Sequence, residues 1–514
     1  MKRLKKKRIL IVNCYFDELR LGIRRKFKYP QSMTIAFLAG LFSRNNCDIR
    51  LYDEVYSGPL EDEHLLAFPD MLVLTGLNSA FDRMLHITAY VRTKNPKAVV
   101  VAGGPAIRAL FHYSKQFFDY CCVGDVEQLH EVIAEALGVG YVSEMFLETG
   151  WVIPRFDLAY WTNFIHYVEA SRNCYYRCSY CSLTAERARY KPYEIEYIRQ
   201  QFLALGRQRL IHFLDNNFAT SDQTILANRF ALLRELREQR YFRRWGAEVT
   251  SDFFLREENL ELARQSGCVA LFSGVESFNT KVLLSFRKYQ NTSLPQVKMI
   301  RNCLEAGITF YYGIVLDTTT RTIKELNEEL EYIVGNPDIT LPSFITLAIP
   351  LLGTPLFYQC LEKNLILPNV KLRDMDGLTL TTKPMGGIAE TAQFINEIQN
   401  LHPFRKKIFR HVKDFYWRYK NIIPRRIMAF AQCNAMLLCA PVLSTAGFEV
   451  GRLYLKGFRN GYRTFVGSTE SLDAVYRPAF RVESKYRNYF QPTMLSDAQG
   501  GLSENLHADL LHTN

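Results

Sequence analysis

The stretch Asn173-Cys174-Tyr175-Tyr176-Arg177-Cys178-Ser179-Tyr180-Cys181 decides how this chain of 514 residues is read. Its cysteines are spaced C-x3-C-x2-C, and cysteine thiolates close together in a loop are the usual ligands of an iron–sulfur cluster. Three such ligands would leave one iron of a [4Fe–4S] cluster open to a small molecule. A structural zinc site needs four ligands, and no second C-x2-C or H-x3-H pair completes one. A redox C-x2-C pair would leave Cys174 without a role.

The motif resembles the signature of the radical SAM enzymes, in which an aromatic residue, here Tyr180, precedes the last cysteine. The resemblance extends over roughly residues 1–390. It implies that Cys174, Cys178 and Cys181 hold a [4Fe–4S] cluster, whose open iron chelates the amino and carboxylate groups of S-adenosylmethionine. It also implies reductive cleavage of S-adenosylmethionine to a 5′-deoxyadenosyl radical, which abstracts hydrogen from the substrate.

Length and composition predict a globular, cytoplasmic protein of two or three domains, with 48% apolar residues. The basic start, Met1–Arg8, is followed by an apolar run too short for a signal peptide, and no apolar stretch is long enough for a transmembrane helix. The net charge of +12 favours an anionic partner or a solvated basic surface. No nucleic-acid-binding motif is found, so nucleic acid is not an expected partner.

Residues 1–140 alternate apolar runs with helical stretches, which predicts a parallel sheet with helices on both faces. This is the α/β pattern of a Rossmann-like, flavodoxin-type domain, whose ligands lie at the carboxyl ends of the strands. The expected strands are 9–12, 48–52, 71–75, 98–102 and 118–123, and the expected helices are 31–45, 80–93 and 105–115.

Glycine-rich loops follow three of these strands and resemble those of the cobalamin-binding domain found in many radical SAM enzymes. The resemblance implies cofactor contacts by Thr75, Gly76, Leu77, Asn78, Gly103, Gly104, Gly124 and Glu127. The D-x-H-x-x-G motif of histidine-ligated cobalamin proteins is missing, with Val55 in place of the histidine, so cobalt should lack a histidine ligand. Leu77 or Asn78 is then expected nearest the lower cobalt face. The alternative is an empty or nucleotide-binding domain, although no G-x-G-x-x-G follows the first strand.

Residues 141–160 form a linker, with extended chain expected over 148–154. Six strand–helix units then follow in residues 161–395, which matches the partial (β/α)6 TIM barrel of radical SAM cores. The cysteine loop follows the first strand, at the carboxyl face where barrel enzymes place their chemistry. The expected strands are 166–171, 210–215, 245–251, 269–276, 309–316 and 344–349, and the expected helices are 193–205, 224–239, 257–266, 294–306 and 322–334.

Three further motifs of this region resemble stretches of the family that bind S-adenosylmethionine. Asp215, Asn216 and Asn217 end the second strand and offer acceptors for its ammonium group, or alternatively form an Asx turn or helix cap. Glu276 ends the fourth strand and could bind a ribose hydroxyl, because a carboxylate in an apolar strand is costly without a role. Gly353 lies in a P-x-x-G-T-P-L stretch whose backbone usually lies against the adenine, or forms a plain turn.

Residues 396–514 are expected to be mainly helical and have no assigned role. The helix expected over 405–420 is basic and amphipathic, so it either contacts a membrane surface or caps the barrel. The polar tail, 497–514, is expected to fray.

The interpretation is a cobalamin-dependent radical SAM enzyme that methylates an unactivated carbon of a small-molecule or lipid-like substrate. Its expected cofactors are a [4Fe–4S] cluster, S-adenosylmethionine and cobalamin, its expected partner is an electron donor such as flavodoxin or ferredoxin, and it is expected to be a monomer. The alternatives are a radical cyclase or rearranging enzyme that uses cobalamin without methyl transfer, and a non-catalytic cobalamin- or redox-sensing module.

Overall fold

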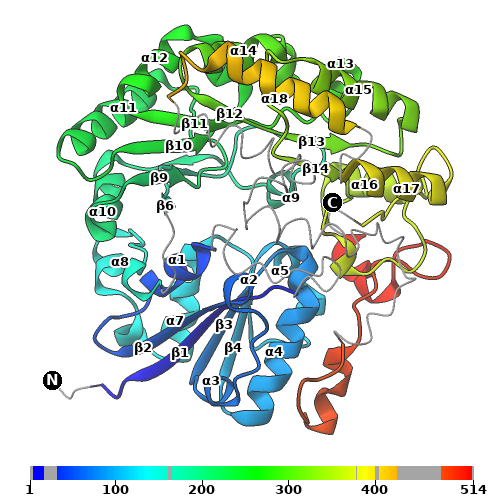
Figure 1. The fold of residues 1–514 in the computed structure, drawn as a ribbon. Coiled ribbons are helices and arrows are strands. Elements are labelled where there is room, and N and C mark those ends of the chain that lie inside the picture. The colour runs from blue at the N-terminus through cyan, green and yellow to red at the C-terminus, as the bar shows by residue number, and fades with distance from the viewer. Residues whose placement is uncertain are drawn as a thin grey trace.

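The computed structural model describes residues 4–16, 32–159, 165–377, 379–399, 404–424 and 476–511. Figure 1 shows two α/β units, one above the other, with the end of the chain beside the lower unit. The lower unit contains the first strands of the chain, and the upper unit is a curved sheet with helices on its outer side. The α/β class expected from the sequence is confirmed.

The first unit is a five-stranded parallel sheet in the order β2-β1-β3-β4-β5. This is the flavodoxin-type order, as expected. Its central strands are continuous apolar runs because helices cover both faces, and Ile9 to Val12 are completely buried. The strands are β1 (Lys7–Asn13), β2 (Cys47–Asp53), β3 (Met71–Thr75), β4 (Val99–Gly103) and β5 (Tyr120–Cys122).

The helices of this unit are α1 (Thr34–Gly40), α2 (Glu54–Ser57), α3 (Glu63–Ala67), α4 (Phe81–Lys94), α5 (Pro105–Ala109), α6 (Phe111–Ser114) and α7 (Leu129–Ala136). Two expectations are corrected. The helix expected over 31–45 covers only seven residues, and the helix expected over 105–115 is interrupted at Leu110. Leu110 leaves helical geometry (φ −121°, ψ 49°) and its side chain is completely buried, so packing overrides local helix propensity there.

The linker contains a helix, α8 (Glu144–Thr149). The Ser143 side chain accepts a hydrogen bond from the Phe146 N–H (3.4 Å), and the helix ends at Gly150 with φ +71°, a left-handed conformation that favours glycine. The extended chain expected from residue 148 therefore begins only after Gly150.

The second unit contains a parallel sheet in the order β12-β11-β10-β9-β6 and a parallel pair, β13-β14. Its strands are β6 (Ile165–Val168), β9 (Leu210–Phe213), β10 (Arg244–Glu248), β11 (Cys268–Phe272), β12 (Thr309–Tyr311), β13 (Gly313–Leu316) and β14 (Phe344–Leu347). Its helices are α10 (Ile195–Leu205), α11 (Gln223–Glu238), α12 (Glu257–Gln265), α13 (Thr280–Ser285), α14 (Gln296–Glu305), α15 (Ile323–Gly335), α16 (Pro355–Glu362) and α17 (Ile388–Gln399).

The strand expected over 309–316 is broken at Tyr312. The Tyr312 carbonyl accepts a hydrogen bond from Ser343 N–H (2.7 Å), and its hydroxyl donates to the carbonyl of Thr340 (2.8 Å). A parallel β-bridge between Glu276 and Ile314 connects the segment after β11 to β13. If β12 and β13 are counted as one broken strand, the unit has six strands in a curved arrangement, as the resemblance implies.

Helix α18 (Arg405–Tyr419) packs on α15 with the apolar face identified in the sequence. Ile408, Phe415 and Tyr419 are buried, and the Tyr419 hydroxyl donates to the carbonyl of Asp338 (2.7 Å). The apolar face of α18 therefore caps the barrel, as one of the two expectations for this helix stated. Within the part of the chain that the structure describes, no helix has the length and apolar character needed to cross a membrane.

The end of the chain packs against the first unit, so the fraying expected over 497–514 is wrong for residues 497–511; the last three residues lie outside the described ones. Asp509 accepts hydrogen bonds from the backbone N–H groups of His112 (2.8 Å) and Tyr113 (2.9 Å). Tyr476 donates to Asp82 of α4 (2.6 Å), and Leu506 and Leu510 are buried. The short helices here are η10 (Ser484–Phe490), η11 (Glu504–Leu506) and α21 (His507–Leu510).

Candidate active site

The three cysteines lie in a loop at the carboxyl end of β6. A short antiparallel pair, β7 (Ser171–Arg172) and β8 (Lys191–Pro192), closes the base of this loop, and α9 (Ser182–Glu186) begins directly after Cys181. The Cys178 carbonyl accepts hydrogen bonds from the Thr184 hydroxyl (2.8 Å) and from Cys181 N–H (3.2 Å). These bonds turn the loop back on itself between Cys178 and Thr184.

Three thiols in one loop suit an iron–sulfur cluster, whose usual ligands are cysteine thiolates. No three His, Cys, Asp or Glu side chains converge on one metal position among the residues that the structure describes. A [4Fe–4S] cluster has a separate iron for each thiolate, so its ligands stand around a cube rather than a point. Burial, with a smaller contribution from the thiols of Cys178 and Cys181, raises the pKa of Cys174 to about 11. The Gln290 amide donates to Cys178 Sγ (3.6 Å).

A buried triad of Tyr180, Glu276 and Lys288 lies beside the cysteine loop. Glu276 Oε1 accepts from the Tyr180 hydroxyl (2.7 Å) and pairs with Lys288 Nζ (2.7 Å), and Lys288 also donates to Tyr180 (3.0 Å). Burial, and secondarily the charge of Glu276, raises the pKa of Tyr180 well above its usual value. Lys288 was not singled out in the sequence, because a lysine in a turn ordinarily marks solvent.

The backbone around Glu276 is constrained. Glu276 has φ +61°, an uncommon conformation for a residue with a side chain. A Cβ on Gly274 would lie 2.3 Å from Glu276 Oε1 and 2.6 Å from Lys288 Nζ, so a larger residue here would displace the ends of these two side chains. The structure holds the glutamate against its ion-pair partner despite this strain.

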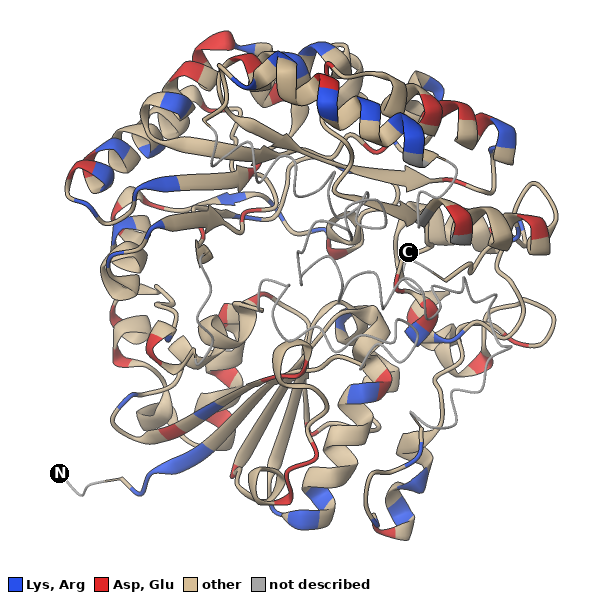
Figure 2. Ribbon diagram, in the orientation of Figure 1, with Lys and Arg blue, Asp and Glu red and all other residues tan. Residues whose placement is uncertain are grey.

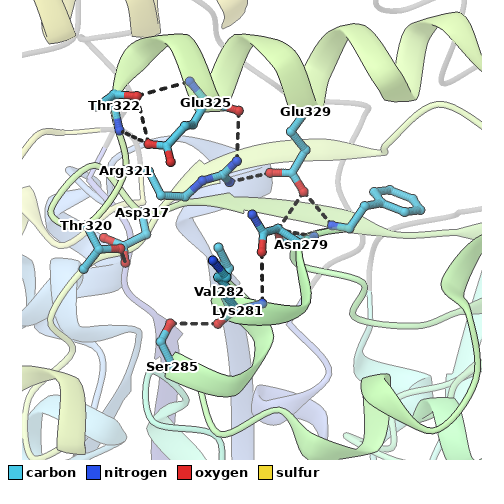
Figure 3. Close-up of polar contacts among 12 residues, drawn as sticks. Asn279, Lys281, Val282, Ser285, Asp317, Thr320, Arg321, Thr322, Glu325 and Glu329 are labelled. Carbon is cyan, nitrogen blue, oxygen red and sulfur yellow. Dashed lines mark hydrogen bonds and ion pairs between the residues drawn. The ribbon is translucent and has the colours of Figure 1, made fainter.

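A second ion pair fixes the segment after Glu276 (Figure 3). Glu329 on α15 accepts from the Ser277 hydroxyl (2.6 Å) and Phe278 N–H (2.5 Å), and it pairs with Arg321. Arg321 also donates to the Glu325 carbonyl (2.9 Å). This network joins the end of β11 to α15, and so it limits movement of Glu276.

The predicted rim residues after β9 separate into two groups. Asp215 is buried, and accepts from Ala170 N–H (2.9 Å) and from the Ser171 hydroxyl. Asn217 is also buried and accepts from Thr250 N–H (3.2 Å), while its Nδ2 has no partner among the described residues. Asn216 is exposed. Asp215 and Asn217 thus brace the neighbouring strand ends, and Asn216 remains accessible.

Glu248, at the end of β10, was not identified from the sequence. Its carboxylate has no hydrogen-bond or ion-pair partner in the described part of the chain. Burial, with a smaller contribution from Asp215, raises its pKa to about 7. The sequence could have identified Glu248, because a glutamate at the end of an apolar strand is the feature that identified Glu276.

Gly353 lies in a turn against the cysteine loop. Its φ of +73° favours glycine, and an added Cβ would lie 3.3 Å from Ala185 Cβ on α9. Leu356 N–H, at the start of α16, donates to the Ser179 carbonyl (2.9 Å). The P-x-x-G-T-P-L stretch and the cysteine loop therefore form one contiguous surface.

The glycines after β3 and β4 of the first unit pack closely. A Cβ on Gly104, which has φ +115°, would lie 2.7 Å from the Gly76 carbonyl oxygen. Gly103 has no such restriction, because its added Cβ would lie 3.5 Å from Cys122 Cβ and 3.7 Å from the Cys122 carbonyl oxygen, both ordinary contacts. In the loop that starts at Thr75, Leu77 is 68% exposed, whereas Asn78 is buried with an unpartnered Oδ1. This edge offers an apolar side chain and close backbone approach to a ligand.

The loop after β5 connects the two units. Gly124 N–H donates to Gln128 (2.6 Å), and Glu127 pairs with Arg172 beside the cysteine loop (2.6 Å). Burial opposes ionisation, but the Arg172 charge holds the pKa of Glu127 below its usual value. Glu127 thus acts across the interface between the units, which the sequence did not predict.

Arg108 on α5 makes a second connection. It donates to the carbonyls of Val123 (2.5 Å) and Gly124 (3.0 Å) and pairs with Glu186 on α9. With Arg172–Glu127, this bond joins the carboxyl edge of the first sheet to the cysteine loop of the second. Figure 1 shows the two edges facing each other, with α5 and α9 between them.

Residues 168–331 match the radical SAM superfamily. This match identifies a radical SAM region within the chain. The chain is also similar in sequence to the hopanoid C-2 methylase of Rhodopseudomonas palustris, with 26% identity over 348 residues. That match covers 64% of each chain. Bacteriochlorophyllide d C-12(1)-methyltransferase of Chlorobaculum tepidum is 24% identical over 38% of this chain and 42% of its own length.

Two solved structures of radical SAM enzymes share the fold. The cobalamin-dependent enzyme OxsB, with aqua-cobalamin and S-adenosylmethionine bound, superposes with a TM-score of 0.58 at 14% identity and covers 95% of this chain and 79% of its own. TsrM from Kitasatospora setae, a radical S-adenosylmethionine methyltransferase with cobalamin and a [4Fe–4S] cluster, gives 0.54 at 15% identity, covering 88% and 99%. The resemblance to cobalamin-type radical SAM proteins is thus confirmed at the level of the fold. The chain spans less than two thirds of the length of the curated relatives it matches.

Proposed function

We propose that this protein is a cobalamin-dependent radical SAM methyltransferase that acts on an unactivated carbon of a small-molecule or lipid-like substrate. The observation that carries the proposal is the direct connection of the two strand edges by Arg108–Glu186 and Arg172–Glu127. A radical source and a methyl carrier must both reach one substrate carbon, and these ion pairs set the two candidate sites against each other.

The proposal assigns cobalamin to residues 1–140 and the cluster with S-adenosylmethionine to residues 161–395. When bound, the cluster supplies the electron that cleaves S-adenosylmethionine, and cobalamin supplies the methyl group. The donor chemistry suits both: three cysteine thiols in one loop for the cluster, and for cobalamin the glycine edge with exposed Leu77. A one-electron donor such as flavodoxin or ferredoxin belongs to the proposal, as does a monomeric state.

The residues of the chain bind and orient the proposed cofactors. Cys174, Cys178 and Cys181 hold the cluster, and the Gln290 amide contacts one of these thiols. Glu276 uses Oε1 for Tyr180 and Lys288, which leaves Oε2 to accept a ribose hydroxyl. The backbone at Gly353 forms a wall for the adenine, and exposed Asn216 offers polar atoms at the rim. The interface pairs Arg172–Glu127 and Arg108–Glu186 keep the two halves in register.

The methylase names of the two sequence relatives support methyl transfer over cyclisation. Both names also refer to compounds with large ring systems, a hopanoid and a bacteriochlorophyllide. An apolar, ring-containing substrate is therefore the class we propose.

Mass spectrometry with methyl-labelled S-adenosylmethionine tests the proposal. With reductant, hydroxocobalamin and a panel of ring-containing lipids and tetrapyrroles, the protein should form 5′-deoxyadenosine, S-adenosylhomocysteine and a product carrying the label. Cys178→Ala should abolish 5′-deoxyadenosine formation. A product without label, formed with 5′-deoxyadenosine, would instead establish the cyclase-type alternative, and no turnover of S-adenosylmethionine would favour a sensing module.

A further inference from the structure

A basic pocket lies at the amino ends of β9 and β10, the end of the sheet away from the cysteine loop. It encloses about 950 Å³. Its lining residues are His166, Arg207, Gln208, Arg209, Arg237, Arg240, Phe242, Arg243 and Arg244. Six of these nine residues are arginines and none is acidic. Figure 2 shows the basic residues at the amino ends of these strands.

Two loops of the barrel bring these arginines together. One joins α10 to β9 and the other joins α11 to β10. Gln208 N–H donates to the Tyr241 carbonyl (2.7 Å), and Arg244 N–H donates to the Arg209 carbonyl (3.2 Å). These backbone bonds hold the loops side by side, so the arginines of both face one space.

The positive charge of the pocket is not balanced by the protein. Among the residues that the structure describes, none of the six arginines forms an ion pair; Arg237 donates to the carbonyl of Gln265 (3.0 Å). The nearby carboxylate of Glu235 is paired with Arg199, outside the pocket. Nδ1 of His166 is buried and has no hydrogen-bond partner among the described residues. Like charges held at short range repel, so an anion bound here would relieve an existing cost.

The chemistry of the lining selects the anion. The guanidinium fork matches the oxygens of phosphate in a bidentate way and is favoured where phosphate is recognised. Six such groups call for several negative charges, and the volume exceeds that of one phosphate group. We propose that this pocket binds a phosphate-bearing polyanion, of the size of a triphosphate or a phosphorylated head group.

The site is separate from the proposed chemistry. The six residue-to-residue steps from Arg209 to Asp215, along the strand and its end, span about 20 Å at the usual rise of a strand. The ligand would therefore not contact the cysteine loop, and the inference does not depend on methyl transfer.

Binding of tripolyphosphate to the whole protein tests the inference, measured by calorimetry at low and moderate salt. Wild type should bind one equivalent, and binding should weaken as salt rises. Arg207→Gln/Arg243→Gln, with one change in each loop, should weaken binding at least tenfold, and so should Arg209→Gln/Arg244→Gln. The matched control, Arg264→Gln/Arg301→Gln, removes two arginines from outside the pocket and should bind as wild type does.

A second arm identifies the source of the phosphate. Flotation with vesicles of phosphatidylglycerol and phosphatidylcholine, against phosphatidylcholine alone, reports head-group binding. Vesicle binding that is lost in the pocket variants, without tripolyphosphate binding, would assign the site to lipid head groups. Absence of binding in both arms, or equal weakening in the control, would overturn the inference. Circular dichroism and melting of each variant establish that it is folded.

Discussion

At the scale of single residues, the triad of Glu276, Lys288 and Tyr180 carries the most concentrated charge beside the cysteine loop. A buried ion pair adds little over an apolar replacement, but removal of one partner leaves an uncompensated charge. The Glu276–Lys288 pair has its partners at 2.7 Å and almost no exposure. Removal of either residue would therefore leave the charge of the other buried and uncompensated.

Lys288→Met should lower the free energy of unfolding by about 3–5 kcal/mol, because Glu276 would remain buried without its cation. Urea unfolding checks this. The double variant Lys288→Met/Glu276→Gln should recover most of the loss, since no charge is then stranded. Lys281→Met, at an exposed lysine on α13, serves as the control and should change stability by less than about 0.5 kcal/mol. Equal losses in the single and double variants would show that packing, not charge, is responsible.

Glu248 gives a pH-dependent prediction. Its folded-state pKa is raised to about 7, so the folded protein holds this proton more tightly than the unfolded chain does. Its contribution to stability is therefore lost as pH rises from the unfolded pKa, near 4.5, through 7. Glu248→Gln should stabilise the protein above that window, by on the order of 2 kcal/mol, and should have little effect near pH 4.5.

Thermal unfolding of wild type and Glu248→Gln across this range measures the difference. Glu238→Gln, at an exposed glutamate on α11, should show no pH-dependent gain. A gain for Glu248→Gln that is the same at every pH would mean that the Glu248 carboxyl ionises over the same pH range in the folded and the unfolded chain, so that folding does not raise its pKa.

At the scale of elements, the loops after β3 and β4 meet through Gly76 and Gly104. Gly104→Ala combines a left-handed backbone with a contact of 2.7 Å to a carbonyl oxygen, so the loop must shift. Hydroxocobalamin should then bind at least about tenfold more weakly, since left-handed backbone costs about 1–2 kcal/mol without glycine. Absorption titration gives the affinity. Gly103→Ala, its neighbour with ordinary contacts, should change the affinity less than about threefold; equal effects would contradict the role of this edge.

Elements with a strong apolar period could be predicted from the sequence. The strand Met71–Thr75 was predicted with its observed bounds, and strand–helix alternation predicted the parallel pairing of the first sheet. The break at Tyr312 could not be predicted, because it depends on bonds to Ser343 and Thr340, some 30 residues away along the chain. Local propensity carries no information on such contacts.

The site was predictable in part for the same reason. Cys174, Cys178 and Cys181 are close in sequence, so their spacing alone brings them together. Glu127 was expected at cobalamin but pairs with Arg172, and Lys288 was not singled out. Both depend on which residue of a distant loop comes to face them. The roles of these residues toward the cofactors remain predictions.

At the scale of the whole molecule, the two interface ion pairs should couple radical formation to methyl transfer. Arg108→Ala/Arg172→Ala should leave 5′-deoxyadenosine formation largely intact but lower labelled product about 10–100-fold, because small misplacements of reacting groups are costly. Chromatography with mass detection gives both amounts. Arg8→Ala/Arg199→Ala removes three ion pairs that lie within single units and should keep the wild-type ratio. A parallel loss of both products would instead place these arginines in the radical step.

Because residues 476–511 pack on α4, this helix is covered only late in the synthesis of the chain. Eleven residues of α4, from Phe81 to Val91, are buried, and contacts such as Tyr476 with Asp82 and Tyr90 with the N–H of Ala479 help to cover them. A ribosome that has made the first sheet must still synthesise almost four hundred residues before this cover exists. The nascent first unit therefore exposes one flank of α4 throughout translation. Its maturation waits for the last segment made, so the unit translated first is among the last to be completed.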